Sequence, residues 1–200
     1  VTLATINNRV RVDFFVPEHF WNKIDWFVKS SDLKFNAKGI PFLHVCISKE
    51  LPEPIPNGNF VGVDLGINRP AVTSNNQFLG ERRWKDVLTR SKRLRRDLQA
   101  KGTKSAKRHL KRLSGRENRF RADCDHVLSR RILNSVPVGT TIVLEDLTNI
   151  RSKARQRKSQ RHRFHTWSFR RLQTFLEYKA KLEGKIAEYV DPHYTSQKCS

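Results

Sequence analysis

The sequence predicts a mixed α/β fold whose sheet contains both antiparallel and parallel strand pairs. Strand-like segments at 60–66 and 70–75 are followed by a short one around Phe78 and by a long helical region. A strand, a helix and a last strand complete the pattern. A hairpin region followed by a strand that is reached through a crossover produces such a sheet. Ligand sites in these sheets favour the carboxyl ends of the strands.

Residues 1–58 predict a small β-rich module that ends in a linker. The strand-like runs TINNRVRVDFFV and FLHVCISKE flank EHFWNKIDWFVKS, which fits a short helix. Residues 51–58, LPEPIPNG, combine prolines with a glycine, a composition that prevents both ladder hydrogen bonding and helix continuation. Trp21 and Trp26 have two interpretations, either a core-facing stripe or rings that stack on nucleic-acid bases.

Residues 59–200 carry the elements of the mixed sheet together with a helical insertion over 81–137. Apolar residues recur in this insertion at helical spacing, so one face is apolar while Arg and Lys coat the others. We expect the helices to be interrupted at KGTKS, 101–105, and again at SG, 114–115. The apolar positions are Leu94, Leu98, Leu110, Leu113, Phe120, Val127, Leu128 and Ile132.

The remaining elements have start and stop signals. An Asn-Asn pair at 75–76 predicts a hairpin turn. The β-branched run TTIVLEDL predicts a buried strand that ends in acids. The segment HTWSFRRLQTFLEYKAKLEG predicts an amphipathic helix with Thr166 or Ser168 as its N-cap and Gly184 as its stop signal. KIAEYVD predicts one more strand.

The charge composition predicts a polyanionic partner. Lys and Arg number 40 against 19 Asp and Glu, a formal net charge of +21 that exceeds what solubility requires. Nucleic acid is expected rather than a membrane, because no apolar run approaches the about twenty residues of a spanning helix and no signal peptide is recognisable. Cys46, Cys124 and Cys199 are too few for a disulfide framework, which fits a reducing cytosol. We expect Cys46 and Cys124 to pack in the core.

Asp64 lies among apolar residues in NFVGVDLGINRP, where burying an unpaired carboxylate is unfavourable. The local pattern allows turn amides, a buried Arg or a metal ion as the compensating partner. Glu145 occupies the equivalent place on the second acid-ended strand, and adjacent strands would bring the two carboxylates within a few ångströms of one another. Facing acids repel unless they share a proton or a divalent cation, and Mg²⁺ suits a protein whose partner brings phosphates.

The runs FVGVDLGINRPAV, TTIVLEDL and WSFRRLQTFLEYKAKLEGKIAEYVDPHYTSQKCS together resemble the TnpB family, transposon-encoded RuvC-like nucleases related to type V CRISPR effectors. The resemblance implies an RNase H-like (RuvC) fold for residues 59–200, preceded by the end of a wedge or β-barrel module. It also implies RNA-guided cleavage of DNA by two-metal-ion hydrolysis, with a guide RNA and target DNA as partners, in the cytoplasm of a bacterium or archaeon.

The resemblance assigns metal ligands by position. It implies that Asp64 bridges two Mg²⁺ ions, that Glu145 binds one of them, and that a third acid completes the site. In the family the third acid follows a zinc ribbon, whereas this chain ends inside the ribbon, so we expect a piece of a longer protein that cleaves poorly or not at all. Asp191 fits a strand end and an Asp-Pro turn instead. Cys199 resembles the first thiolate of the ribbon, and we expect Zn²⁺ only in a longer chain.

The basic residues divide into two sets. Those on the predicted helices are either solvated faces or the wall of a nucleic-acid channel. The run 151–163, inside a lid-like segment 151–165, has no acid and no periodicity, so phosphate contact is its expected role. Candidate phosphate-binding residues are Arg151, Lys153, Arg155, Arg157 and Lys158. The alternatives to a nuclease are a non-catalytic basic nucleic-acid-binding protein or another RNase H-like transposase or resolvase.

Overall fold

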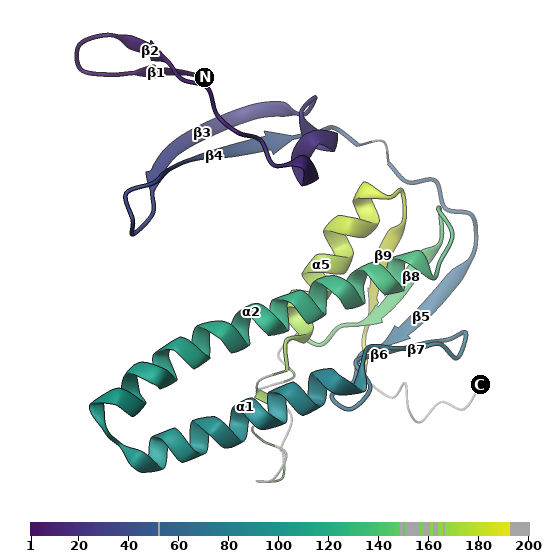
Figure 1. The fold of residues 1–200 in the computed structure, drawn as a ribbon. Coiled ribbons are helices and arrows are strands. Elements are labelled where there is room, and N and C mark those ends of the chain that lie inside the picture. Colours follow the sequence, from purple (N-terminus) through teal and green to yellow (C-terminus); the bar gives the residue numbers. More distant parts are fainter. Residues whose placement is uncertain are drawn as a thin grey trace. The chain divides into compact units, whose positions relative to one another are not determined.

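The protein forms two compact units, residues Val1–Leu51 and Pro52–Ser200 (Figure 1). The proline-rich stretch that follows Pro52 belongs to the second unit, where the Asn57 side-chain amide donates to the Val138 carbonyl oxygen at 2.9 Å. None of the described helices combines the length and the apolar character that crossing a membrane requires. The computed structural model describes residues 1–51, 53–148, 150, 157, 161, 164–165 and 167–192.

The first unit consists of two antiparallel hairpins. The first pairs β1, Thr2–Ala4, with β2, Arg9–Arg11, and the second pairs β3, Phe27–Phe35, with β4, Pro41–Ser48. Between the hairpins, η1 forms a short 3-10 helix over Glu18–Lys23. The predicted helix over EHFWNKIDWFVKS is therefore wrong in its second half, because FVKS begins β3 and pairs with β4 instead.

No residue of the first unit is buried. Trp21 is 58% exposed and its indole N–H donates to the Val16 carbonyl oxygen at 3.1 Å, so a core-facing role is not seen for this ring. Trp26 is half-exposed and has the Lys23 ammonium 5.6 Å from its ring centroid. Cys46 is exposed, because a two-stranded sheet leaves both faces of β4 open, and the expectation of a core-packed thiol is wrong there.

The second unit contains a five-stranded sheet with the order β7-β6-β5-β8-β9. β5, β6 and β7 pair antiparallel, whereas β5 pairs parallel with β8 and β8 pairs parallel with β9. The predicted mixed α/β architecture is confirmed. The strands are β5 Phe60–Asp64, β6 Ala71–Thr73, β7 Phe78–Leu79, β8 Thr141–Glu145 and β9 Ile186–Val190.

Two long helices, α1 (Arg82–Lys101) and α2 (Lys104–Asn134), form an antiparallel hairpin that extends beyond the sheet (Figure 1). The predicted break near 101–105 is confirmed: Gly102 ends α1 at φ 63°, and the Thr103 hydroxyl caps α2 by accepting from the Ala106 amide at 3.2 Å. The predicted interruption at 114–115 is wrong, because α2 runs through it. One glycine costs a helix only about 1 kcal/mol, which side-chain contacts with α1 offset.

A third long helix, α5 (Phe169–Leu182), packs against α2 and against β9. It ends near Gly184, φ 63°, as predicted. Ser168 precedes the helix but makes no capping bond, and Thr166 lies outside the described residues. The predicted hairpin turn is also present, with Asn76 at φ 58° between β6 and β7.

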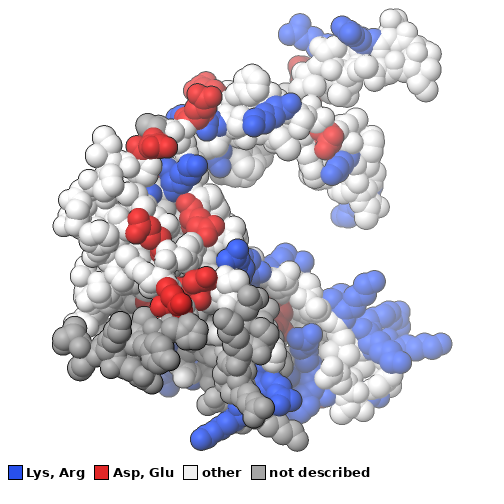
Figure 2. Space-filling model, turned by 180° about the vertical axis from the view of Figure 1, so that it is seen from behind, with Lys and Arg blue, Asp and Glu red and all other residues white. Residues whose placement is uncertain are grey.

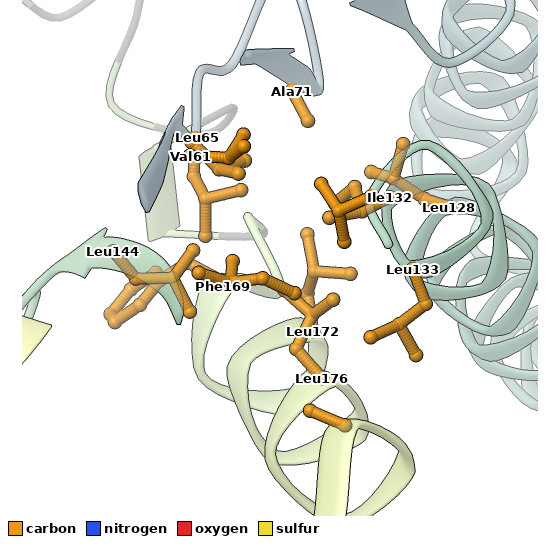
Figure 3. Packing of buried hydrophobic residues seen from close by; sticks show 14 of the residues in the cluster. Val61, Leu65, Ala71, Leu128, Ile132, Leu133, Leu144, Phe169, Leu172 and Leu176 are labelled. Carbon is orange, nitrogen blue, oxygen red and sulfur yellow. The ribbon is translucent and has the colours of Figure 1, made fainter. Parts of the chain in front are cut away.

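The core of the second unit lies between the sheet and the helices α2 and α5 (Figure 3). Val61 and Val63 are buried, whereas Phe60 is 66% exposed and Asp64 is exposed. Side chains along this strand alternate between the core and the solvent, so the expectation that Asp64 is a buried carboxylate is wrong. Cys124 is half-buried and packs against this core, as expected. The buried members are Val61, Val63, Leu65, Ala71, Trp84, Leu128, Ile132, Leu133, Val136, Ile142, Leu144, Leu147, Phe169, Leu172, Leu176 and Ala180.

Candidate active site

The two candidate carboxylates end neighbouring parallel strands. Val63 of β5 lies opposite Leu144 of β8, and Asp64 and Glu145 each follow by one residue as the last residues of their strands. Adjacent strands are about 4.8 Å apart, so the two backbones are neighbours at this edge of the sheet. Val63 and Leu144 are buried under the helices, and the alternation of the strands therefore directs both acids to the opposite face.

Asp64 does not carry the burial penalty that the sequence suggested. Its side chain is exposed, and Glu145 is half-buried. No ion pair or side-chain hydrogen bond joins Asp64 to another residue in the described part of the chain. The turn amides and the buried Arg that could have compensated a buried charge are therefore not its partners there, and what distinguishes Asp64 is a second carboxylate on the next strand.

The chain after Asp64 turns back in a tight loop. A Cβ atom on Gly66 would meet the Arg69 carbonyl oxygen at 2.7 Å, closer than real Cβ contacts, so glycine is required there. The Arg69 guanidinium carbon lies 4.5 Å from the Phe78 ring centroid on β7. The Leu-Gly turn thus returns the chain to β6 and leaves Asp64 at the rim of the sheet.

Asp146 has a different role from Glu145. Its carboxylate accepts a hydrogen bond from the Thr148 amide at 2.9 Å, and its own amide donates to the Val190 carbonyl oxygen of β9 at 2.8 Å. This arrangement is an Asx turn that leads the chain out of the sheet. Asp146 therefore shapes the strand end, and Glu145 is the carboxylate that lies across from Asp64.

A buried glutamine on α5 supports the end of β8, and the sequence argument did not identify it. The Gln173 side-chain N–H donates to the Glu145 carbonyl oxygen at 2.8 Å, and Gln173 is 1% exposed. The only sequence signal was a polar residue on the buried side of an amphipathic helix, next to Leu172.

Two carboxylates are a partial set of metal ligands. Across the described ranges, no group of three or more His, Cys, Asp or Glu side chains could hold a metal ion. Asp191 directly follows β9. Cys199 and the candidate phosphate-binding residues Arg151, Lys153, Arg155 and Lys158 lie outside the described residues, whereas Arg157 is described and exposed.

A groove of about 760 Å³ lies beside the loop that follows β5 and is walled by α1 and α2. Asp125 of α2 lines it and anchors α5, because Ser168 donates to this carboxylate at 3.0 Å and Arg171 at 2.6 Å. Burial raises the pKa of Asp125, although these two hydrogen bonds oppose the rise. Burial likewise raises the pKa of the Cys124 thiol to about 12, so this groove-lining cysteine is protonated at neutral pH.

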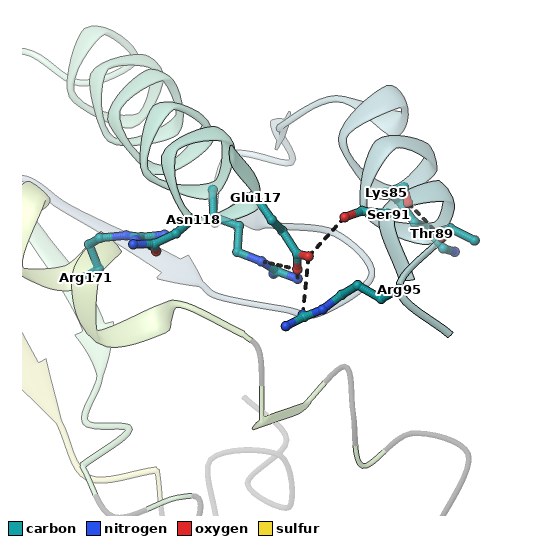
Figure 4. A network of polar contacts seen from close by, with 8 residues as sticks. Lys85, Thr89, Ser91, Arg95, Glu117, Asn118 and Arg171 are labelled. Atoms are coloured by element: carbon teal, nitrogen blue, oxygen red, sulfur yellow. Dashed lines mark hydrogen bonds and ion pairs between the residues drawn. The ribbon is translucent and has the colours of Figure 1, made fainter. Parts of the chain in front are cut away.

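Glu117 of α2 joins the two helices of the hairpin (Figure 4). Its carboxylate accepts from the Ser91 hydroxyl at 3.0 Å, from Arg95 at 3.4 Å and from Arg121 at 2.8 Å, and its side chain is only 9% exposed. Burial opposes its ionisation, but the hydrogen bonds from Arg121 and Ser91 and the nearby positive charges hold the pKa of Glu117 below its usual value. A lone acid between basic neighbours was a signal that sequence reasoning could have used.

The hairpin presents a basic surface. Figure 2 shows Lys and Arg side chains crowding over it with few acidic side chains between them. Between Arg90 and Arg119 the acids are Asp97, which pairs with Arg96 at 3.1 Å, and Glu117. The exposed basic residues of this stretch are Arg90, Lys92, Arg93, Arg96, Lys101, Lys104, Lys107, Arg108, Lys111, Arg112, Arg116 and Arg119.

Comparison with known proteins finds two family models and several relatives that match parts of the chain. A family model described as "Probable transposase", OrfB_IS605, matches residues 44–151, and the model of the Cas12f1-like TNB domain matches residues 169–200. A TnpB-like protein of Methanocaldococcus jannaschii is 40% identical over 92 residues, which cover 45% of this chain and 33% of the relative.

Two further relatives are CRISPR-associated endodeoxyribonucleases. Cas12f2 of a Micrarchaeota archaeon is 32% identical over 120 residues, 58% of this chain and 22% of the relative. Cas12f1 of Sulfoacidibacillus thermotolerans is 39% identical over 84 residues, 40% of this chain and 18% of the relative. The chain thus spans about a third or less of the length of the relatives it matches. Because the transposase model covers more than half of the residues and the relatives agree with it, the chain belongs to the OrfB_IS605 family of probable transposases, the family of TnpB.

Proposed function

We propose that this chain carries the nuclease region of an RNA-guided DNA endonuclease of a transposable element, with an RNase H-like (RuvC) fold. The observation that carries the proposal is the pair Asp64 and Glu145 at neighbouring ends of parallel central strands in a TnpB-family chain. Relatives named endodeoxyribonucleases support DNA as the substrate, and a formal net charge of +21 supports nucleic acids as partners.

The carboxylate pair fits Mg²⁺ by its donor chemistry. Mg²⁺ in phosphate-processing sites is held by one or two carboxylates together with phosphate oxygens and waters. Two carboxylates at one sheet edge therefore match the number of protein ligands that such an ion uses. Mg²⁺ bound there would polarise the scissile phosphate and activate the attacking water. The role of Asp64 and Glu145 would be to bind the metal ion and orient it toward the phosphate. The paired strands β5 and β8 hold the backbones of the two residues side by side.

The basic hairpin compensates for the carboxylates in substrate binding. Two acids alone repel a phosphodiester, whereas exposed Lys and Arg along α1 and α2 attract the backbone of DNA or RNA without reading its sequence. We propose that this surface holds the guide RNA or the target DNA, and that Arg151, Lys153, Arg155, Arg157 and Lys158 add phosphate contacts close after β8.

Mn²⁺ binding, followed by electron paramagnetic resonance, tests the metal site without requiring catalysis. We expect the 200-residue chain to bind Mn²⁺, and Asp64→Asn and Glu145→Gln each to weaken binding about 10-fold or more. Asp97→Asn is the matched control, because it removes the same charge from an exposed residue of α1. In the native gene product with its co-purified RNA, Asp64→Ala should abolish Mg²⁺-dependent plasmid cleavage. Cleavage that survives this substitution would refute the proposed site.

A second function, nucleic-acid binding without catalysis, is favoured by one observation. Within the described residues the two carboxylates are not joined by a third metal-ligating side chain. The same experiment separates the two functions. If the chain binds RNA and DNA in a salt-sensitive way, and Asp64→Asn leaves its Mn²⁺ affinity unchanged, the non-catalytic binding function is supported and the proposed nuclease site is excluded.

A further inference from the structure

Gln173 is a polar residue in an otherwise apolar interface. It lies on α5 between the buried residues Leu172 and Leu176 and is 1% exposed. Its N–H group donates to the backbone carbonyl oxygen of Glu145 at 2.8 Å. Its own amide oxygen is buried and has no hydrogen-bond partner among the described residues. Gln173 thus makes one long-range hydrogen bond and leaves its acceptor unsatisfied.

This arrangement is a poor way to stabilise a core. A neutral hydrogen bond contributes modestly to stability, whereas a buried acceptor without a partner loses its hydration with nothing in return. A leucine or methionine of similar size would fill the same space beside Leu172 without burying an amide. The net effect of Gln173 on folding is therefore small or unfavourable, and a functional role explains it better.

What Gln173 holds is the end of the strand that carries Glu145. β8 is paired on both sides, with β5 and with β9, and the chain leaves the sheet directly afterwards through the Asp146 turn. Gln173 approaches from the helix side, where Leu144 is buried, while the Glu145 side chain is directed to the other face. The hydrogen bond therefore fixes the backbone of the last strand residue without occupying its carboxylate.

The helix that carries Gln173 is itself held at both ends by α2. Near its start, Asp125 accepts from Ser168 at 3.0 Å and from Arg171 at 2.6 Å. Near its end, the buried Lys179 ammonium donates to the Ser129 hydroxyl at 2.7 Å. A donor on such a rigid element can set the position of the Glu145 backbone within a narrow range.

We propose that Gln173 is a positioning residue for Glu145, an inference that rests on the proposed function of Glu145 as a Mg²⁺ ligand. The hydrogen bond holds the strand end so that the Glu145 carboxylate stays beside Asp64. Groups that orient a metal ligand through a hydrogen bond typically change metal affinity by about 10–100-fold when removed.

The test compares Mn²⁺ affinity with stability in the 200-residue chain. Gln173→Leu and Gln173→Met remove the donor and keep most of the side-chain volume. We expect both variants to weaken Mn²⁺ binding about 10-fold in electron paramagnetic resonance titrations. Their melting temperature in EDTA should equal or exceed that of the wild type. The matched control, Leu176→Val, lies on the same helix and is fully buried, so it should lower the melting temperature and leave Mn²⁺ affinity unchanged.

The outcomes separate this inference from the proposed function. Mn²⁺ binding that depends on Asp64 but is unchanged in both Gln173 variants overturns the positioning role alone. Mn²⁺ binding that does not depend on Asp64 overturns the proposed metal site and the positioning role together. Unfolding of both Gln173 variants in EDTA assigns Gln173 to the core and also overturns the inference. Weaker Mn²⁺ binding with unchanged folding supports it.

Discussion

The substitution Asp64→Asn should stabilise the protein without metal and destabilise it, relative to the wild type, with metal. Asp64 is exposed and makes no ion pair with another described residue, while Glu145 ends the adjacent parallel strand. Asparagine keeps the size of the side chain and removes the charge. The substitution therefore isolates the electrostatic interaction between the two strand ends from packing, which Val63 and Leu144 provide on the other face.

The magnitude follows from strand spacing. Carboxylates about 5 Å apart in a largely aqueous environment repel by about 0.8 kcal/mol, and physiological salt reduces this to about 0.5 kcal/mol. Asp64→Asn should therefore raise the melting temperature in EDTA by about 1–2 °C. Mg²⁺ at a hundred times its dissociation constant should add about 2.7 kcal/mol to the wild type, about 5–10 °C, and about 1.4 kcal/mol or less to the variant, whose affinity is expected to fall 10-fold or more.

Differential scanning fluorimetry in EDTA and over a Mg²⁺ series measures both effects. The expected signature is a crossing, because the variant melts higher without Mg²⁺ and the wild type melts higher with it. Asp97→Asn, which removes a charge from exposed α1, should follow the wild type throughout. Stabilisation of Asp64→Asn by Mg²⁺ to the same extent as the wild type, rather than by about half as much or less, would refute the reasoning, and so would a lower melting temperature of Asp64→Asn in EDTA.

Two further predictions concern the hairpin. Glu117→Gln should lower the free energy of unfolding by about 2 kcal/mol at pH 7, measured by urea denaturation, because it weakens charge-assisted bonds from both helices. Since the pKa of Glu117 is lowered in the fold, its contribution is present above the unfolded pKa of about 4.3 and is lost as pH falls through the folded value. In Glu117→Gln this part of the pH dependence of the unfolding free energy should be absent. A variant with the same pH dependence as the wild type would contradict the prediction. Lys107→Gln with Lys111→Gln on exposed α2 should reduce the salt slope of single-stranded DNA binding by about 0.7 per lost contact in fluorescence anisotropy; an unchanged slope would exclude these residues as phosphate contacts.

Much of the second unit follows from local pattern. β-branched runs predicted β5 and β8, and the glycine at 102 marked the break between α1 and α2. The glycine at 115 carried the same local signal but did not break α2, because Glu117 and its neighbours contact α1 and outweigh a small propensity cost. Local composition does not distinguish these two glycines, whereas tertiary contacts do.

In the first unit, the local sequence pattern did not predict the secondary structure of residues 27–30. The Trp/Phe-rich run EHFWNKIDWFVKS fitted a helix, with Trp21 and Trp26 either on a core-facing stripe or free to stack on bases, but 27–35 is a strand and nothing in the unit is buried. An aromatic-rich run of this kind suits either state, and its partner decides which one forms. Here the partner is β4, whose β-branched residues complete an antiparallel ladder.

The neighbouring positions of Asp64 and Glu145 could be predicted from the sequence, but the exposure of Asp64 could not. Asp64 was identified as a costly buried acid, whereas the alternation of β5 leaves it exposed. The prediction that it has a carboxylate neighbour depended on β5 and β8 being adjacent, which the order of elements suggested. The role of Gln173 was not predictable, because its partner is a backbone carbonyl group 28 residues away. Every residue has such a group, so the sequence does not indicate which one a side chain contacts.

The choice between Glu145 and Asp146 shows what strand register contributes. The sequence LEDL offers two adjacent acids, and side chains alternate between the faces of a strand, so a shift of one residue would exchange their roles. The pairing of Val63 with Leu144 places Glu145 across from Asp64, and the Asx turn uses Asp146 to end the strand. Asp146→Asn should therefore preserve the turn, since the amide oxygen still accepts from the Thr148 amide, and leave Mn²⁺ affinity close to that of the wild type. The asymmetry between these neighbouring acids follows from register, not from their chemistry.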